Sequence, residues 1–276
     1  MKKLFKKIYF ALPFKKNIFL KLKRYVVLPE KIYRHLRFKE PFLVKIDSKH
    51  SFNCYNDSII ENEIFWNGFG KCWEKTSLDL WTRLSTQSEI ILDIGANNGI
   101  YSLVSTAVNS KAKTFAFEPN PLYIPSLKKN ISVNNFQERM FPIQLAVGEK
   151  TGVCEIDDYS EIGKKIISDT VSIDDYVEKA NLNKVDLIKI DVELYEVYVI
   201  KGLLNTIQKY KPSIIIEVLS DSIASELSEL LDKFNYLYFN LNEENFGIRK
   251  VDKLSKSDYY NFLICTEEKA KFLNLI

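Results

Sequence analysis

The sequence contains few of the residues that metal centres and disulfide frameworks need. Its 276 residues include four cysteines, and no two of them form a Cys-x-x-Cys pair. Such scattered thiols favour reduced cysteines in a reducing compartment and argue against a zinc site or a disulfide framework. The two histidines, His35 and His50, are too few for a centre built from several imidazoles. We therefore expect no metal site.

Long apolar runs are also missing. No stretch approaches the roughly 18–20 apolar residues that a membrane-spanning helix requires. The start of the chain is basic like a signal peptide, but its apolar run, residues 8–14, is short and ends at Lys15. No small-residue cleavage site follows it. We expect a protein that is neither secreted nor transmembrane and that works in the cytoplasm.

Positive charge is concentrated in one segment. Residues 1–45 carry fourteen Lys and Arg and two acids, so this segment has a charge of +12 and the remainder −9, for a net charge of +3. Leu4, Ile8 and Leu12 recur at helical spacing among the lysines. Such a basic amphipathic helix either lies on an anionic membrane or packs, solvated, on the body of the protein. We expect peripheral association with the inner membrane face through residues 1–26, and no nucleic-acid partner, because the acidic body would repel a phosphate backbone.

From residue 89 onward, apolar runs rich in Ile, Val and Phe alternate with helical stretches. This pattern predicts an α/β fold with a parallel sheet covered on both faces. The predicted strands are residues 89–94, 113–118, 141–147, 185–191 and 213–218. The predicted helices are residues 99–109, 121–135, 195–210 and 221–233.

The last part of the chain lacks a helix between its two apolar runs. Residues 235–242 and 259–268 are therefore expected to pair as an antiparallel edge of the sheet. Residues 148–184 contain no strong central strand, and within them we expect a short strand, a cap at Asp174 and a short helix. The predicted domains are a basic amphipathic arm (1–50), a cap or substrate-lid region (51–85) and a catalytic domain (86–276).

The most informative stretch is EIILDIGANNGIYSL, residues 89–103. Gly95 and Gly99 lie where the first strand of the sheet becomes a helix, which is where open α/β sheets bind ligands. The amide groups at the helix start can receive a carboxylate or a phosphate. The Gly-x-Gly-x-x-Gly fingerprint of dinucleotide sites is absent. A nucleotide-dependent oxidoreductase is therefore improbable.

Two acids favour another cofactor. Asp93, just before the glycines, would face a pyrophosphate unfavourably but suits a ligand with an ammonium group. Glu118 ends the next strand and can accept hydrogen bonds from both hydroxyls of a ribose. An ammonium, a carboxylate and a ribose together describe S-adenosylmethionine better than NAD.

Four segments in this order resemble the FkbM family of S-adenosylmethionine-dependent methyltransferases. They are DIGANNGIYSL, FEPNP, LAVGEKTG and LIKIDVELYEVYVIKG, and the similarity covers roughly residues 55–265. The resemblance implies a class I (Rossmann-like) methyltransferase fold, a seven-stranded sheet with its last strand antiparallel, here with an N-terminal basic helical extension. It also implies O-methylation of a hydroxyl, most often of a sugar in a polysaccharide or glycolipid precursor.

The resemblance assigns cofactor contacts to the strand ends. Asp93, Gly95, Asn97 and Gly99 would surround the methionine part of S-adenosylmethionine, and Asp93 would reach its amino group directly or through water. The other expected cofactor residues are Tyr101 beside the methionine pocket, Glu118 and Asn120 at the ribose, and Ala146 at the adenine. Tyr101 and Ala146 have the strongest alternative, which is ordinary packing.

The acceptor is expected at the end of the fourth strand, in the sequence KIDVELYE. Methyl transfer needs an aligned nucleophile, and a carboxylate can take the hydroxyl proton. Asp191 is the expected base or acceptor-orienting group, and Glu193 is the second catalytic candidate. Glu196 is a candidate for substrate binding, although an acid in a first helical turn also stabilises the helix dipole.

One residue departs from the family pattern. The residue after Glu193 is usually glycine in the family and is Leu194 here, which puts the acceptor and, to a lesser degree, activity in doubt. The alternative function is a non-catalytic homologue that binds S-adenosylmethionine or a glycan. Trp66 is a candidate substrate lid because exposed aromatic rings stack on sugars, whereas Trp81 lies in a helical pattern that predicts core packing.

Overall fold

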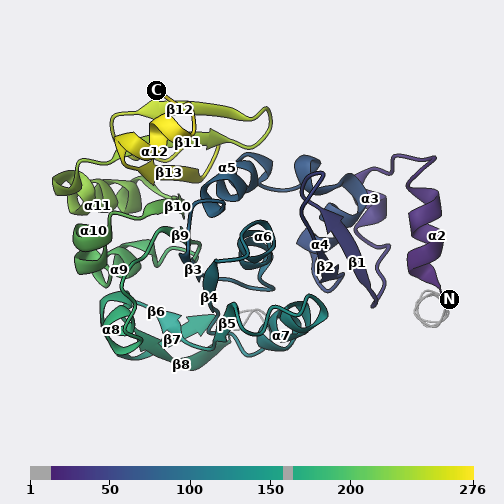
Figure 1. The fold of residues 1–276 in the computed structure, drawn as a ribbon, viewed down its shortest axis with the longest axis horizontal. Helices are drawn as coiled ribbons and strands as arrows, with labels where there is room; N and C mark the ends of the chain where they lie inside the picture. Colours follow the sequence, from purple (N-terminus) through teal and green to yellow (C-terminus); the bar gives the residue numbers. More distant parts are fainter. Residues whose placement is uncertain (1–13, 158–163) are drawn as a thin grey trace. The chain divides into compact units, whose positions relative to one another are not determined.

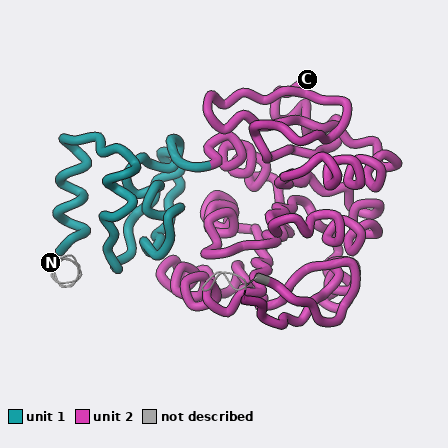
Figure 2. The backbone as a smooth tube through the Cα atoms, turned by 180° about the vertical axis from the view of Figure 1, so that it is seen from behind, with its two compact units in different colours: residues 1–73 teal, residues 74–276 magenta. Residues whose placement is uncertain are grey.

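The computed structural model describes residues 14–157 and 164–276. The chain separates into two compact units, Met1–Trp73 and Glu74–Ile276, shown in Figure 2. The division lies between the two domain boundaries expected from the sequence, which followed residues 50 and 85.

Unit 1 combines short helices with a two-stranded hairpin. Its elements are α2 (Lys15–Leu22), α3 (Glu30–Tyr33), β1 (Pro41–Lys45), β2 (Ser51–Tyr55), α4 (Ile59–Asn67) and the 3-10 turn η1 (Phe69–Lys71). Asp47 stabilises the turn of the hairpin, because its Oδ1 accepts hydrogen bonds from the backbone N–H groups of Lys49 and His50 at 2.6 and 2.7 Å. Ser58 caps α4 together with Glu61. Part of the segment expected to be a helical arm is therefore a strand.

Unit 2 contains one large mixed sheet with strand order β12-β11-β13-β10-β9-β3-β4-β5. Its strands are β3 (Ile90–Ile94), β4 (Lys113–Phe117), β5 (Met140–Ile143), β9 (Leu187–Ile190), β10 (Ser213–Glu217), β11 (Leu237–Asn242), β12 (Gly247–Val251) and β13 (Asn261–Cys265). The five from β5 to β10 are parallel, and β13 is antiparallel to both of its neighbours. The predicted α/β class and the antiparallel last strand are confirmed.

The sheet has one strand more than the seven expected. Strand β12 pairs with β11 as an antiparallel hairpin, and Asn242 Oδ1 accepts a hydrogen bond from the backbone N–H of Glu244 in its turn. The sequence of β12, GIRKV, is short and carries two charges. That composition is typical of an edge strand, and it hides the strand from a search for apolar runs.

The predicted third strand, residues 141–147, is wrong in its second half. Strand β5 ends at Ile143, and Ala146–Val147 form β6 of a separate three-stranded sheet. This sheet continues with β7 (Gly152–Asp157) and β8 (Lys165–Val171), where the sequence predicted one short strand. The cap of the following helix is Ser172, whose Oγ accepts from Asp175 N at 3.1 Å, and not Asp174.

Helices cover both faces of the large sheet, as Figure 1 shows. On one side are α5 (Lys75–Ser85), α6 (Ile100–Val108) and α7 (Ile124–Val133), and on the other α9 (Glu196–Lys201), α10 (Leu204–Tyr210) and α11 (Asp221–Leu231). Two shorter helices, α8 (Ile173–Lys179) and α12 (Glu267–Phe272), and the 3-10 turn η2 (Asp232–Phe234) complete the unit. The predicted helix 195–210 is broken at Gly202, where a Cβ would overlap the backbone of Gly148.

Alternation along the strands decides which side chains face the site. Ile188 and Ile190 of β9 belong to the buried core that contains α9–α11. The residue between them, Lys189, must therefore point to the α5/α6 face. Asp93 of β3 points to the same face, since its carboxylate accepts a hydrogen bond from Ser102 of α6. The large sheet is thus apolar on one face and partly polar on the other.

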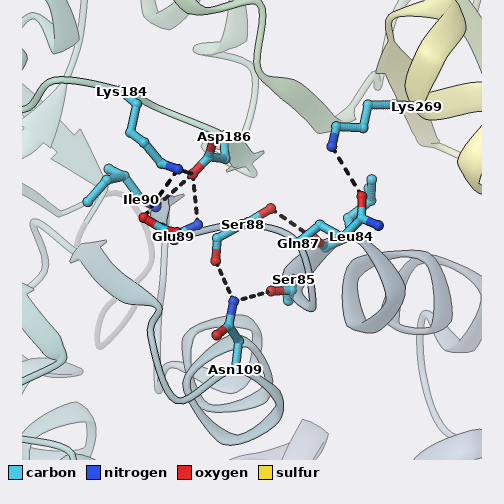
Figure 3. A network of polar contacts seen from close by, with 10 residues as sticks. All are labelled: Leu84, Ser85, Gln87, Ser88, Glu89, Ile90, Asn109, Lys184, Asp186 and Lys269. Carbon is cyan, nitrogen blue, oxygen red and sulfur yellow. Dashed lines mark hydrogen bonds and ion pairs between the residues drawn. The ribbon is translucent and has the colours of Figure 1, made fainter.

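The amino ends of the strands are fixed by a polar network, drawn in Figure 3. Asp186 Oδ2 accepts hydrogen bonds from the backbone N–H groups of Glu89 and Ile90 at 2.7 and 2.9 Å. Lys184 Nζ lies 3.4 Å from Asp186 Oδ2, and Asn109 Nδ2 donates to two carbonyls of the segment before β3. This network fixes β3 against β9 at the edge opposite to the glycine turn.

Candidate active site

The turn after β3 requires glycine at two positions. Gly95 and Gly99 have φ values of +83° and +86°. A Cβ on Gly95 would overlap the carbonyl oxygen of Asp191, and one on Gly99 would overlap Leu127 and lie 2.9 Å from the terminal methyl of Met140. The turn therefore packs directly against the end of β9, and its backbone stays close to the sheet.

Glu118 connects this turn to the end of β4. Its Oε2 accepts a hydrogen bond from Asn97 N and its Oε1 one from Asn120 N, both at 2.8 Å. Each carboxylate oxygen keeps a further lone pair for a ligand hydroxyl. Burial raises the pKa of Glu118 to about 7, and the two backbone N–H groups oppose that rise. The sequence predicted this residue at a ribose, and the structure places it beside the glycine turn.

Two buried amide atoms at the same place lack partners. Within the described part of the chain, Asn97 Oδ1 and Asn120 Nδ2 have no hydrogen-bond partner. Buried polar atoms are nearly always paired in folded proteins, so two orphaned atoms side by side at a strand end leave room for a water, an ion or a ligand. One of these atoms accepts and the other donates, and Glu118 adds acceptor capacity. This set fits the ammonium, carboxylate and ribose of S-adenosylmethionine.

Asp93 lies below the turn and faces α6. Its Oδ2 accepts hydrogen bonds from Ser102 N at 3.0 Å and from Ser102 Oγ at 2.6 Å. The side chain is buried, and this burial raises the pKa of Asp93 to about 6. One carboxylate oxygen is therefore engaged in holding the start of α6, and the expected contact with the amino group of a cofactor stays a prediction.

Tyr101 and Ala146 each have packing or pairing contacts of their own. The hydroxyl of Tyr101 donates to Glu74 Oε2 at 2.6 Å, and its ring packs edge-on against Trp81. Ala146 is buried in β6, where it pairs with Thr170 of β8, and does not end the third strand of the large sheet. The predicted cofactor contacts of both residues stay predictions, beside the packing alternatives that the sequence left open. Trp81 itself is fully buried in α5, as predicted.

A second polar group occupies the α5/α6 face at the ends of β9, β10 and β13. Lys189 is 1% exposed, and its Nζ lies 3.2 Å from Asp191 Oδ2 and 3.5 Å from Asn261 Oδ1. Glu74 is also buried, and its Oε1 accepts a hydrogen bond from Asn261 Nδ2 at 2.7 Å. Burial raises the pKa of Glu74 to about 7, against the opposing charge of Lys189. The predicted Asp191 thus belongs to a paired network.

Sequence reasoning missed several members of this group. Glu74, Glu217 and Asn261 were not identified, and Lys189 was given no role. A signal was present for two of them. Lys189 interrupts the apolar strand LIKI, and Glu217 ends the apolar strand SIIIE, so each is a charged residue in a central strand of a buried sheet.

Glu193 and Glu196 have different surroundings. Glu193 is exposed at a φ of +51°, and partial burial, followed by the charge of Asp191, raises its pKa. Glu196 is fully buried, and its Oε1 accepts a hydrogen bond from Leu194 N at 3.2 Å. Its Oε2 has no hydrogen-bond partner among the described residues, so the predicted contact with substrate stays a prediction. Oε1 stabilises the turn before α9, which is the alternative stated from the sequence.

Trp66 belongs to the core of unit 1. It is 8% exposed, its ring packs against Phe19, Tyr33 and Phe65, and its Nε1 donates to Leu36 O at 3.4 Å. A ring enclosed in this way has no free face for a sugar. The predicted lid role for Trp66 therefore does not fit the structure, because the aromatic residues around it form their own core.

Leu194 should be replaceable by glycine with a gain in stability. It has a φ of +75° and is 57% exposed, so the backbone is strained and little apolar area is buried. Relief of about 1–2 kcal/mol of strain exceeds the roughly 0.5–1 kcal/mol that glycine loses in chain entropy. We expect Leu194→Gly to raise the unfolding free energy by about 0.5–1 kcal/mol in urea titrations. Leu122→Gly, at an exposed turn position without positive φ, should lower it, and equal changes in both variants would contradict the strain.

Among residues 14–157 and 164–276, no group of three His, Cys, Asp or Glu side chains is arranged to hold a metal ion. No helix in these ranges has the length and apolar character needed to cross a bilayer. The expected membrane association through residues 1–26 falls partly on residues 1–13, which lie outside the described residues, and it stays a prediction, as does the cytoplasmic location.

Comparisons with known proteins give consistent matches. The model of the methyltransferase FkbM domain matches residues 93–241. The hexuronic acid methyltransferase AglP of Haloferax volcanii is 25% identical over 170 residues, which cover 58% of this chain and 68% of that protein.

Solved structures are matched at lower identity. The methyltransferase FkbM of Methylobacillus flagellatus is 18% identical with a TM-score of 0.44, over 64% of this chain and 43% of that chain, which is less than half of its length. A SAM-dependent O-methyltransferase of Thermotoga maritima is 14% identical with a TM-score of 0.42, over 82% of this chain and 77% of that chain.

Proposed function

Because the chain belongs to the FkbM family of methyltransferases, we propose that it transfers a methyl group from S-adenosylmethionine to a hydroxyl of a sugar in a polysaccharide or glycolipid precursor. The observation that carries the cofactor assignment is the Glu118 carboxylate, which binds Asn97 N and Asn120 N between two orphaned amide atoms. The sugar assignment is supported by the similarity to a relative that is named as a hexuronic acid methyltransferase.

Residues at different strand ends would contact different parts of the cofactor and the acceptor. Glu118 and Asn120 at the end of β4 would hold the ribose, and the turn that contains Gly95 and Asn97 would lie against the methionine part. S-adenosylmethionine, when bound, supplies an electrophilic methyl carbon attached to sulfur. Asp191, at the end of β9 beside the glycine turn, would contact the acceptor hydroxyl. The protein would then act mainly by alignment and by removal of one proton.

The alternative is a homologue that binds S-adenosylmethionine or a glycan without turnover. The feature that favours it is Leu194 in place of the family's glycine, at a φ of +75°. Its side chain is largely exposed and therefore does not fill a buried space. Turnover with any acceptor would exclude this alternative, whereas cofactor binding alone would leave it standing.

Binding of S-adenosylmethionine should weaken in acid. Burial raises the pKa of Asp93 to about 6 and of Glu118 to about 7, and a ligand with an ammonium group and ribose hydroxyls needs both groups charged. We expect micromolar affinity above pH 8 in calorimetric titrations, and a Kd that rises roughly tenfold per pH unit between about pH 7 and pH 6 and roughly a hundredfold per unit below about pH 6. NAD serves as the control ligand and should not bind.

Unfolding would not imitate this loss of affinity. A carboxyl group whose folded pKa is raised contributes stability that is fully present below its unfolded pKa and is lost as the pH rises through the folded pKa. Asp93 and Glu118 therefore favour the folded apoprotein at low pH. A Kd that is unchanged between pH 8 and pH 5.5, or tight binding of NAD, would contradict the cofactor assignment.

A further inference from the structure

Glu217 lies beside the predicted acceptor residue. It is the last residue of β10, the strand that runs parallel to β9 with Ile216 opposite Ile190. Glu217 follows Ile216, and Asp191 follows Ile190. The two acids are therefore neighbours at the carboxyl ends of adjacent strands. This edge is where open α/β sheets place their ligands.

Alternation along β10 and β13 gives Glu217 the same face as the buried network. Ile216 belongs to the apolar core on the α9–α11 face, so Glu217 points to the α5/α6 face. Its partner across the antiparallel pair is Asn261, whose amide reaches Lys189 and Glu74. Glu217 is therefore next to the network but is not one of its hydrogen-bonded members.

Two of the three other carboxylates around Glu217 are already engaged, and the third, Glu193, is exposed on the segment after β9. Glu74 is buried, and its two oxygens accept hydrogen bonds from Asn261 and Tyr101. Asp191 Oδ2 pairs with the ammonium of Lys189 at 3.2 Å. Glu217 is only partly buried, and no hydrogen-bond partner of its carboxylate occurs in residues 14–157 or 164–276. It is thus free to meet an incoming hydroxyl.

The charges around Glu217 suit a proton acceptor. Burial raises the pKa of Glu217 to about 8, with further rises from Asp191, Glu193 and Glu74 and an opposing effect of Lys189. A base works best when its pKa lies near the working pH, because it is then both largely deprotonated and basic enough to take a proton. Lys189, which is fully buried, holds Asp191 and compensates its charge without reaching the surface.

We propose that Glu217 takes the proton of the acceptor hydroxyl, while Asp191, held by Lys189, orients that hydroxyl. This assignment rests on the proposed function. In the step, the hydroxyl oxygen forms a bond to the methyl carbon while the carbon–sulfur bond breaks and its electron pair goes to sulfur. The O–H bond breaks as well, and its proton passes to the Glu217 carboxylate. Charge balances, since one sulfonium and one carboxylate give a thioether and a carboxylic acid.

The test compares Glu217→Gln and Glu217→Asp with the wild type. Transfer of tritiated methyl groups from S-adenosylmethionine to a panel of methyl glycosides is measured between pH 6 and pH 9. We expect kcat of the wild type to rise about tenfold per pH unit up to about pH 8, because Glu217 must be deprotonated. Glu217→Gln should lower kcat about a hundredfold and flatten this profile, and Glu217→Asp should restore part of the rate. The Kd for S-adenosylmethionine should stay unchanged in all three proteins.

Glu226→Gln is the matched control, since Glu226 is exposed on α11, and it should behave like the wild type. Wild-type rate and pH profile in Glu217→Gln would overturn the proposal. If the wild type binds S-adenosylmethionine but methylates no glycoside, the proposed sugar hydroxyl acceptor fails separately. The role of Glu217 is then tested by measuring the pKa of its carboxyl group with carbon-13 NMR. A titration near pH 8 that shifts to lower pH in Asp191→Asn supports the assignment, and a titration near pH 4.5 overturns it.

Discussion

Gly95→Ala is expected to lower the unfolding free energy by roughly 2–5 kcal/mol. Alanine at a φ of +83° is strained by about 1–2 kcal/mol. Its Cβ would also overlap the carbonyl oxygen of Asp191, a backbone atom at the end of a central strand that cannot rotate away. Overpacking of this kind adds about 1–3 kcal/mol. Because small domains are stable by only about 5–15 kcal/mol, urea unfolding will show a large decrease in the midpoint concentration.

Gly152→Ala provides the matched control for this substitution. A Cβ on Gly152, at the start of β7, has no atom within 4 Å among the described residues, and its φ is not in the left-handed region. The control should leave the midpoint nearly unchanged or raise it slightly, since alanine has less freedom in the unfolded chain. If Gly95→Ala unfolds at the same urea concentration as Gly152→Ala, the turn does not approach β9 as the structure has it.

Much of the fold was predictable because its strongest signals are local. The central strands are continuous apolar runs, and glycine or proline marks where several of them begin or end. The sequence did not predict how the weaker strands pair. Residues 146–147 follow β5 without a long interruption, yet they pair with β8 in another sheet. Strand β12 is charged and short. Neither pairing is visible in local periodicity, because partners far along the chain decide it.

The site was predictable to a similar degree and for a similar reason. Strand-end motifs locate Gly95, Asn97, Glu118 and Asn120 on one edge. The structure joins Asn97 and Asn120 through hydrogen bonds to Glu118, and Gly95 N donates to Phe117 O. A motif does not show what a side chain faces. Tyr101 follows the turn directly, yet it donates to Glu74 on the polar side of the sheet.

The acceptor side depends on contacts between residues that are far apart in the sequence. Lys189 lies 72 residues from Asn261, and Glu74 lies 187 residues from the same asparagine, so only the folded sheet joins them. Alternation within β9 and β10 would have indicated that the charged residues share a face, but not which carboxylate stays free. That distinction separates Asp191, which is paired, from Glu217.

Glu118→Ala is expected to weaken S-adenosylmethionine binding at least a hundredfold. The substitution removes the acceptor for two ribose hydroxyls, and hydrogen bonds to a charged group contribute about 1.5–3 kcal/mol each. It also leaves Asn97 N and Asn120 N without their carboxylate, so the turn loses the contact that connects it to β4. Calorimetry at pH 8, above the pKa of about 7, measures the effect while the wild-type carboxylate is charged.

Loss of affinity must be separated from loss of fold. Glu155→Ala, at an exposed position on β7, is the matched control and should keep both the wild-type Kd and the wild-type Tm. Glu118→Ala removes a charge that is costly to bury in the folded protein. The variant can therefore lose affinity for S-adenosylmethionine without a large fall in Tm. Equal affinity in the two variants would show that the cofactor lies elsewhere than on the Glu118 carboxylate. Lost affinity in a protein that still unfolds cooperatively would leave this carboxylate as the group that recognises the ribose.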